Sequence, residues 1–297
     1  MDKIRKKLNI DDIHRAGITG KNVGIAIIDT GMSAHVDLKD CVVCFKDYVN
    51  NKKNYYDDNG HGTHVAGIIG GNGKKSAGKY KGIAPDSKLV IIKCLDYKGN
   101  GSIKNALEGF DFILKNREKY NIRIVNISLG TSIDNKEADM DSLIEGVEYL
   151  WRKGIIVVAA AGNNGPKEGS ITAPGCAKSI ITVGASDSKS SSVGSDYDFS
   201  GRGPTKECVI KPEIVCPGTN IMSCDVNKFS YMARSGTSMS VPIVSGIIAL
   251  TLEKNPKMTN KELKKMLYKT AIDIGFDKSR QGWGMINPQK MLFDIIP

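Results

Sequence analysis

The chain has 297 residues, of which 40% are hydrophobic and 25% are charged, and its formal net charge at pH 7 is +10. This composition is that of an ordinary soluble globular protein. No apolar run approaches the ~20 residues that a membrane span needs, so we expect no membrane partner. The lysines are spread widely and no nucleic-acid-binding motif accompanies them, so the charge predicts a solvated basic surface and no nucleic-acid partner.

Short apolar runs alternate with helical patterns along the chain. The runs are continuous and rich in β-branched residues, which is typical of parallel strands buried on both faces. They cover 23–29, 89–95, 123–130, 155–163 and 179–185, and helical patterns cover 62–71, 102–120, 138–153, 238–254 and 260–270. This alternation predicts an α/β fold, a doubly wound and mostly parallel sheet with helices on both faces.

No linker composition or internal repeat divides the chain, so we predict one domain over 20–297. A short segment, 1–19, precedes it, and processing could remove that segment. The N-terminus, MDKIRKKLNI, is basic, but no apolar stretch follows it, so we expect no secretory signal and a cytoplasmic location.

The seven cysteines are odd in number and lack the spacing of a disulfide framework, which favours free thiols in a reducing cytosol. Cys41 and Cys44 form a single C-x-x-C, without a second pair or a histidine at zinc-like spacing. We therefore expect no metal there.

Three polar residues stand where the chemistry of an α/β sheet is usually found, outside the carboxyl ends of the strands or at helix starts. Asp29 closes the first apolar run, and His61 begins the helical pattern in HGTHVAG (61–67). His61 and His64 are three residues apart with no adjacent glutamate, which argues against the usual zinc pair. Ser238 opens the apolar helix in SGTSMSVP (235–242), although a cap or a turn explains such a stretch equally well.

A serine becomes a nucleophile only beside a base that a third group, usually a carboxylate, holds in the right tautomer. A helix N-terminus adds free N–H groups that stabilise an oxyanion. Asp29, His61 and Ser238 meet these needs in the order Asp, His, Ser, which is one of the known orders of the catalytic triad.

The motifs IIDTG, HGTHVAG and SGTSMSVP resemble, in order, the three signatures of the subtilases, the subtilisin-like serine proteases. The resemblance covers about 20–284 and implies the family's parallel-sheet fold. The short segment before the first strand resembles intracellular bacterial members, or else a secreted member trimmed to its catalytic domain. It implies that Asp29 orients the histidine, that His61 is general base and then general acid, and that Ser238 is the nucleophile. It also implies structural roles for Ser235 and Ser240 and a first-turn position for Pro242.

Further segments resemble the family's substrate cleft. AAAGNNGP (159–166) implies that Asn163 donates its side-chain amide to the oxyanion together with the Ser238 N–H. SLG (128–130) and GNGS (99–102) resemble the segments that flank an extended peptide, which pairs as an added strand. The residues implied along the cleft are Gly99, Gly101, Ser128, Leu129, Gly130, Ala160 and Gly162. We expect the base of the specificity pocket near 169–170, where no carboxylate is obvious, and hence an apolar or broad preference.

One segment resembles part of a calcium site. HVDLKD (35–40) is similar to a segment that supplies an aspartate to calcium in many secreted members. The loop that would complete the site, 72–82, carries four lysines, whereas hard cations want several oxygen ligands. We therefore expect no metal or cofactor in the chemistry and no calcium at this site; structural calcium elsewhere stays open.

The expected activity is hydrolysis of peptide bonds in a peptide or protein through an acyl-enzyme, in protein turnover or in processing of a precursor. A catalytically silent subtilase that acts as a binding or signalling module is the alternative, but no triad residue is lost here. Acyl transfer to an amine, as in macrocyclisation, would call for an added lid, and no insertion is obvious. The natural substrate and the oligomeric state do not follow from the sequence.

Overall fold

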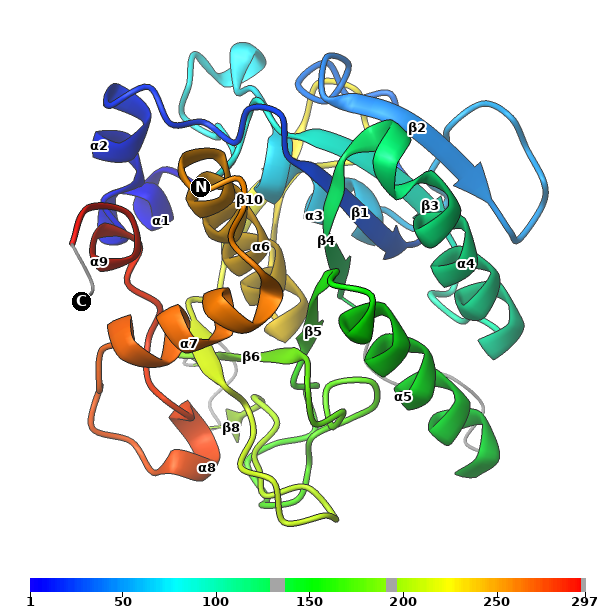
Figure 1. The fold of residues 1–297 in the computed structure, drawn as a ribbon. Helices are drawn as coiled ribbons and strands as arrows, with labels where there is room; N and C mark the ends of the chain where they lie inside the picture. Colours follow the sequence, from blue (N-terminus) through cyan, green and yellow to red (C-terminus); the bar gives the residue numbers. More distant parts are fainter. Residues whose placement is uncertain (129–136, 191–196, 295–297) are drawn as a thin grey trace.

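The computed structural model of the chain describes residues 1–128, 137–190 and 197–294. Its centre is a seven-stranded sheet in the order β2-β3-β1-β4-β5-β6-β9, in which every pair of neighbours is parallel (Figure 1). The strands are β1 (Gly24–Asp29), β2 (Val42–Asp47), β3 (Lys88–Lys93), β4 (Ile122–Ile127), β5 (Ile156–Ala160), β6 (Ile181–Ala185) and β9 (Ile214–Cys216).

Helices cover the sheet on two sides. The long ones are α3 (His61–Gly70), α4 (Ile103–Tyr120), α5 (Glu137–Arg152), α6 (Thr237–Lys254) and α7 (Asn260–Thr270). Figure 1 shows α4 and α5 side by side, whereas α3 packs against α6. This is the doubly wound α/β arrangement that the sequence predicts, and the prediction is confirmed.

Smaller elements complete the described part of the chain. They are the helices α1 (Asp2–Lys7), α2 (Ile10–Arg15), α8 (Lys278–Gln281) and α9 (Pro288–Phe293), the 3-10 turn η1 (Lys74–Ser76), and two antiparallel pairs, β7 (Lys189–Ser190) with β8 (Tyr197–Asp198) and β10 (Ile221–Cys224) with β11 (Tyr231–Arg234). No helix in the described residues is long and apolar enough to span a membrane.

The burial of each strand explains whether its residues form an apolar run that can be recognised in the sequence. Strands β1, β4 and β5 lie inside the sheet and are almost entirely buried, so their apolar runs are continuous. Strand β2 was not predicted, because it lies at the edge of the sheet and most of its residues are only partly buried. Strand β9 has three residues, too few for a pattern.

Helix α6 is the central helix of the fold. Its residues are apolar on all sides and are buried almost throughout, and it packs against β4, β5, β6 and β9 as well as α3. The sequence motif implies a first-turn position for Pro242, but Pro242 is the sixth residue of the helix and lies in its second turn. Because proline has no N–H, the carbonyl of Ser238 lacks its usual partner four residues on.

The N-terminal segment packs into the same core as the rest of the chain. Met1, Ile4, Leu8, Ile10 and Ile13 are buried and belong to the main apolar cluster. The two short helices α1 and α2 had no predicted counterpart. The division at residue 19, and removal of the segment by processing, stay predictions.

Candidate active site

Asp29 and His61 meet where β1 ends and α3 begins. His61 Nδ1 lies 2.8 Å from Asp29 Oδ1 and 2.9 Å from Oδ2. The Asp29 side chain is fully buried, whereas 22% of the His61 side chain is exposed. Gly62 allows this approach, because a Cβ there would lie 2.2 Å from the carbonyl oxygen of Gly31 and 3.2 Å from Asp29 Cβ.

The carboxylate sets the protonation of the imidazole. Burial lowers the pKa of His61, but the charge of Asp29 and its hydrogen bond outweigh burial, so the pKa lies above its ordinary value. Because Nδ1 faces the carboxylate, Nδ1 carries the proton of the neutral ring and Nε2 carries the lone pair. His61 therefore has a basic nitrogen available for proton transfer.

Ser238 is the second residue of α6, and its hydroxyl lies at the carboxyl edge of the sheet. Its Oγ donates a hydrogen bond to the carbonyl oxygen of Ser128, at 2.9 Å, directly after β4. A hydroxyl has one proton to donate, so in this conformation the proton points to Ser128. The proton must turn away from the Ser128 carbonyl before His61 can accept it.

Asn163 lies beside the start of α6 and is held by Thr237. Its Oδ1 accepts hydrogen bonds from the Thr237 backbone N–H, at 3.0 Å, and from the Thr237 hydroxyl, at 3.1 Å. A backbone N–H can only donate, so this contact assigns the amide oxygen and leaves Nδ2 free to donate elsewhere. The N–H of Ser238 is among the first of the helix, which have no intrahelical partner. Two donors therefore lie at the start of α6, where Ser238 is the second residue.

The other two serines of the motif have structural partners. Ser235 Oγ accepts a hydrogen bond from the Asn220 N–H at 2.9 Å, and the buried Ser240 Oγ donates to the Cys216 carbonyl at 2.9 Å. Neither approaches the Asp29–His61 pair through a hydrogen bond in the described residues.

His64 belongs to the core. Its Nε2 lies 3.0 Å from the carbonyl oxygen of Ile221 and 3.1 Å from that of Met232, so Nε2 carries the proton. Burial lowers the pKa of His64 to about 3. The ring is neutral and its donor nitrogen is occupied by these two carbonyl oxygens.

Asp37, in the segment that resembles part of a calcium site, already has donors on its carboxylate. Oδ1 accepts from the Lys75 N–H at 2.9 Å, and Oδ2 accepts from the Tyr231 hydroxyl at 2.6 Å. His35 and Cys224 lie close to it, but both ring nitrogens of His35 are engaged, with the Asp37 N–H and the Ser230 carbonyl. These three residues do not offer a free set of metal ligands.

An arginine side chain donates hydrogen bonds to the neighbouring loop, 72–82. The buried Arg5 guanidinium donates to the carbonyl oxygens of Gly78 at 3.0 Å, Lys79 at 3.2 Å and Lys81 at 2.7 Å, and Nε donates to Asp11 at 2.7 Å. Carbonyl oxygens are the ligands that calcium would need. The loop does not fit a calcium ion, because a cationic side chain already occupies these oxygens.

Those predicted substrate-binding residues that the structure describes lie at the same edge of the sheet. Gly99 and Gly101 belong to a turn closed by the Asp96–Gly99 hydrogen bond, at 3.0 Å, and by a bridge between Leu95 and Gly101. Asn59 Nδ2 donates to the Tyr97 carbonyl at 3.0 Å, which joins this turn to the segment before His61. Ser128 is buried, and Leu129 and Gly130 lie outside the described residues.

Ala160 and Gly162 stand at the end of β5, and Thr172 lies against them. A Cβ on Gly162 would lie 2.4 Å from Thr172 Oγ1, an atom that is buried and without a hydrogen-bond partner in the described structure. The pocket base that the sequence places near 169–170 stays a prediction; in that segment the Ser170 hydroxyl accepts a hydrogen bond from the Arg202 N–H at 3.0 Å. Thr172 carries no motif of its own, and only the fold brings it to Gly162.

Comparisons with known proteins show the family and the fold of the chain. The model of the subtilase family matches residues 20–284. Serine protease AprX of Bacillus subtilis (strain 168) is 39% identical over 92% of this chain and 66% of its own length. Minor extracellular protease Epr of the same strain is 35% identical over 94% of this chain and 40% of its own length. The chain thus spans less than two thirds of these two relatives.

A solved structure, that of a cold adapted subtilisin-like serine proteinase, superposes with a TM-score of 0.71. The two sequences are 30% identical, and the match covers 91% of this chain and 88% of that one. The α/β fold resembles the fold of subtilisin, as the sequence motifs imply.

Proposed function

The chain belongs to the subtilase family of subtilisin-like serine peptidases, and we propose that it is a serine endopeptidase acting through an acyl-enzyme. The observation that carries the proposal is the Asp29–His61 pair, joined by contacts of 2.8 and 2.9 Å at the sheet edge where α6 begins, with Ser238 as its second residue. A buried carboxylate, an imidazole and a helix-terminal serine supply the groups that nucleophilic catalysis by serine requires.

Acylation begins when Ser238 Oγ turns from the Ser128 carbonyl to His61 Nε2. As Oγ attacks the carbonyl carbon of the scissile peptide, Nε2 takes its proton, and Asp29 stabilises the imidazolium that forms. Asn163 Nδ2 and the Ser238 N–H donate hydrogen bonds to the oxyanion. His61 then gives its proton to the leaving amine as the C–N bond breaks, which leaves the acyl group on Ser238.

Deacylation repeats these steps with water. His61 takes a proton from the water that attacks the acyl carbon, and returns it to Ser238 Oγ as the ester breaks. The extended peptide pairs with the segments of Gly99 to Gly101 and Ser128 to Gly130, while Ala160 and Gly162 line the pocket for the side chain before the cut. The substrate is a peptide or a protein.

The proposed setting is the cytoplasm, in protein turnover or precursor processing. All seven cysteines are free thiols, a state typical of a reducing compartment. Four of them are buried, and burial raises their pKa, which for Cys41 reaches about 12. Fractionation of cells that produce the native chain would test the location.

Labelling with a serine-directed organophosphonate tests the activity. We expect the wild type to take up one label per chain, Ser238→Ala to take up none, and Ser240→Ala to be labelled like the wild type. Ser240→Ala is the matched control, because it removes a neighbouring hydroxyl whose partner is the Cys216 carbonyl. A peptide library read by mass spectrometry then identifies the products.

The outcomes separate the alternatives. Hydrolysed peptides support the endopeptidase, whereas peptides joined to an amine would support acyl transfer. A wild type that neither takes the label nor cuts any peptide would contradict the proposal and favour a silent binding module.

A further inference from the structure

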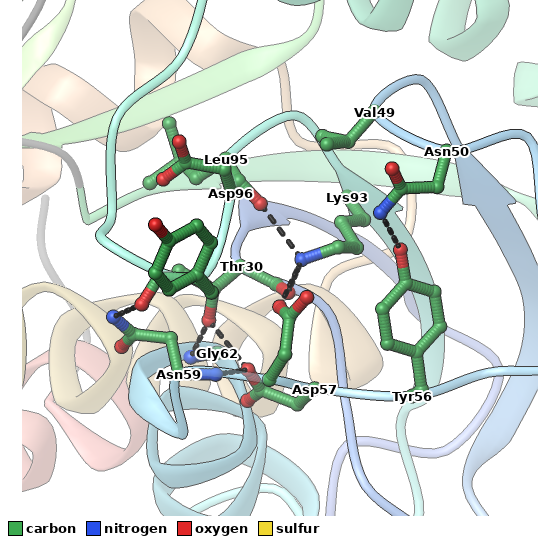
Figure 2. Close-up of polar contacts among 12 residues, drawn as sticks. Thr30, Val49, Asn50, Tyr56, Asp57, Asn59, Gly62, Lys93, Leu95 and Asp96 are labelled. Atoms are coloured by element: carbon green, nitrogen blue, oxygen red, sulfur yellow. Dashed lines mark hydrogen bonds and ion pairs between the residues drawn. The ribbon is translucent and has the colours of Figure 1, made fainter.

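A fully buried lysine, Lys93, lies next to the proposed triad and has no part in the chemistry described so far. It is the last residue of β3 and pairs in register with Asp29 of β1. Its Nζ donates to the carbonyl oxygen of Leu95 at 2.8 Å (Figure 2). It also donates to the carbonyl oxygen of Thr30 at 2.6 Å and to Asp58 Oδ1 at 2.7 Å. All three ammonium protons are therefore used.

The first partner, Thr30, joins the two halves of the Asp29–His61 pair. Its N–H donates to Asp29 Oδ1 at 2.7 Å, and its hydroxyl accepts from the Gly62 N–H of α3 at 2.9 Å. The same hydroxyl donates to Asp57 Oδ1 at 2.9 Å. Lys93 holds the carbonyl of the residue that links Asp29 to the helix carrying His61.

The second partner, Asp58, belongs to the segment that leads into His61. Its neighbour Asp57 accepts hydrogen bonds from the N–H groups of Gly60, at 2.8 Å, and Thr63, at 2.9 Å, and so caps the start of α3. The Lys93–Asp58 ion pair ties this segment to the end of β3. The Lys93 ammonium therefore binds both Thr30, the residue that follows Asp29, and Asp58 in the segment before His61.

A buried charge is costly even when it is paired, and an apolar side chain often serves packing equally well. The Tyr56 ring, centred 4.9 Å from Nζ, adds to the enclosure. We propose that Lys93 is a positioning residue for the hydrolytic reaction, which fixes Asp29 and His61 relative to each other through Thr30 and Asp58. This inference rests on the proposed function.

The variant Lys93→Met tests it. We expect kcat to fall about 10- to 100-fold with KM within about twofold of the wild type, because a small misplacement of reacting groups is costly. The acid limb of the pH profile is the range in which kcat/KM rises with pH as His61 loses its proton. We also expect this limb to move to lower pH, because a loosened Asp29–His61 pair no longer favours the protonated ring as strongly. Melting midpoints and the rate of organophosphonate labelling are measured alongside.

Lys211→Met is the matched control. Lys211 is also fully buried, and it donates to the Ile180 carbonyl at 3.0 Å and to Glu213 Oε1 at 2.6 Å. These partners directly precede β6 and β9, at the amino edge of the sheet and away from the triad. This variant should lower the melting midpoint without moving the acid limb.

Asp58→Asn keeps the test sharp if Lys93→Met does not fold. The Asp58 side chain is 37% exposed, and the amide oxygen of asparagine can still accept a hydrogen bond from Lys93 Nζ, so this change is smaller than Lys93→Met, and we expect a several-fold fall in kcat in the same direction.

A folded Lys93→Met with wild-type kcat and acid limb would overturn the inference. So would a limb that moves to higher pH, since this would indicate an effect of charge alone. A wild type that takes no label would instead overturn the proposed function, and this inference with it.

Discussion

The side-chain oxygen of Asn163 accepts a hydrogen bond from the backbone N–H of Thr237, the residue directly before Ser238. This contact joins the end of β5 to the start of α6. It also decides which end of the amide is free. A Cβ on Gly236 would lie 3.3 Å from Asn163 Nδ2, and the φ of Gly236 is +147°, so glycine leaves room for the amide there.

Replacement of Asn163 by alanine removes this free donor. We expect kcat to fall about 100- to 1,000-fold with little change in KM, because the donor acts on charge that develops only in the transition state. The magnitude is the one known for the equivalent donor of subtilisin, about 2.7–4 kcal/mol. Steady-state kinetics on a peptide substrate measure it.

Asn164→Ala is the control for this prediction, because Asn164 is the adjacent exposed asparagine and has no proposed role. Equal losses in the two variants would contradict a specific oxyanion contact and indicate a general effect on the loop.

The pH dependence of activity should report the ionisation of His61. The general base must be neutral, so kcat/KM rises with pH through the folded-state pKa of His61, which lies above the ordinary 6.5. The pKa of each of the other three histidines, His14, His35 and His64, is lowered by burial. A half-maximal point above pH 6.5 would therefore belong to His61 among the histidines.

Asp29→Asn checks this assignment. Without the carboxylate, burial dominates, so the acid limb should move to lower pH, and kcat should fall by about 10⁴-fold because the wrong tautomer is favoured. A limb that stays in place would mean that another group titrates. The same raised pKa contributes to folding stability below the unfolded pKa of histidine, and that contribution is lost as pH rises through the folded pKa.

Local patterns in the sequence predict much of this fold. Strand β1 is buried on both faces, so its run is continuously apolar, and Asp29 is conspicuous as the polar residue that ends it. Helix α3 begins at His61 and α6 at Thr237, each one residue from the start that the pattern predicts. Edge strand β2 could not be predicted, because it is only partly buried and therefore has no continuous apolar run.

Contacts between distant residues could not be predicted in this way. The hydroxyl of Ser238 donates a hydrogen bond to the carbonyl of Ser128, which is 110 positions away in the sequence. The motif that contains Ser238 does not predict this contact. In the sequence, Lys93 is not distinguished from other polar residues near strand ends. Its proposed positioning role depends on Asp58, which contacts it from a loop. Arg5 lies in a basic N-terminal stretch whose charge suggests solvent exposure, yet its guanidinium is buried against 78–81.

Arg5 offers the last prediction, which concerns stability. Arg5→Ala leaves the carbonyl oxygens of Gly78, Lys79 and Lys81 without their donor, and we expect the free energy of unfolding to fall by about 3 kcal/mol. For a chain of this size such a loss lowers the melting midpoint by roughly 5 °C. Calorimetry or thermal denaturation followed by circular dichroism measures it.

Arg15→Ala is the matched control, because the Arg15 side chain is 74% exposed and its pair with Asp12 is also exposed, so it should change stability little. Since Arg5 supplies the positive charge that loop 72–82 would otherwise take from a cation, a chelator should leave the melting midpoint of the wild type unchanged. A midpoint that falls on chelation would show that a bound metal stabilises the fold, and it would contradict the argument from Arg5 where that metal is bound by loop 72–82. If the chelator has no effect and Arg5→Ala melts early, the guanidinium does for this loop what a metal ion would otherwise do.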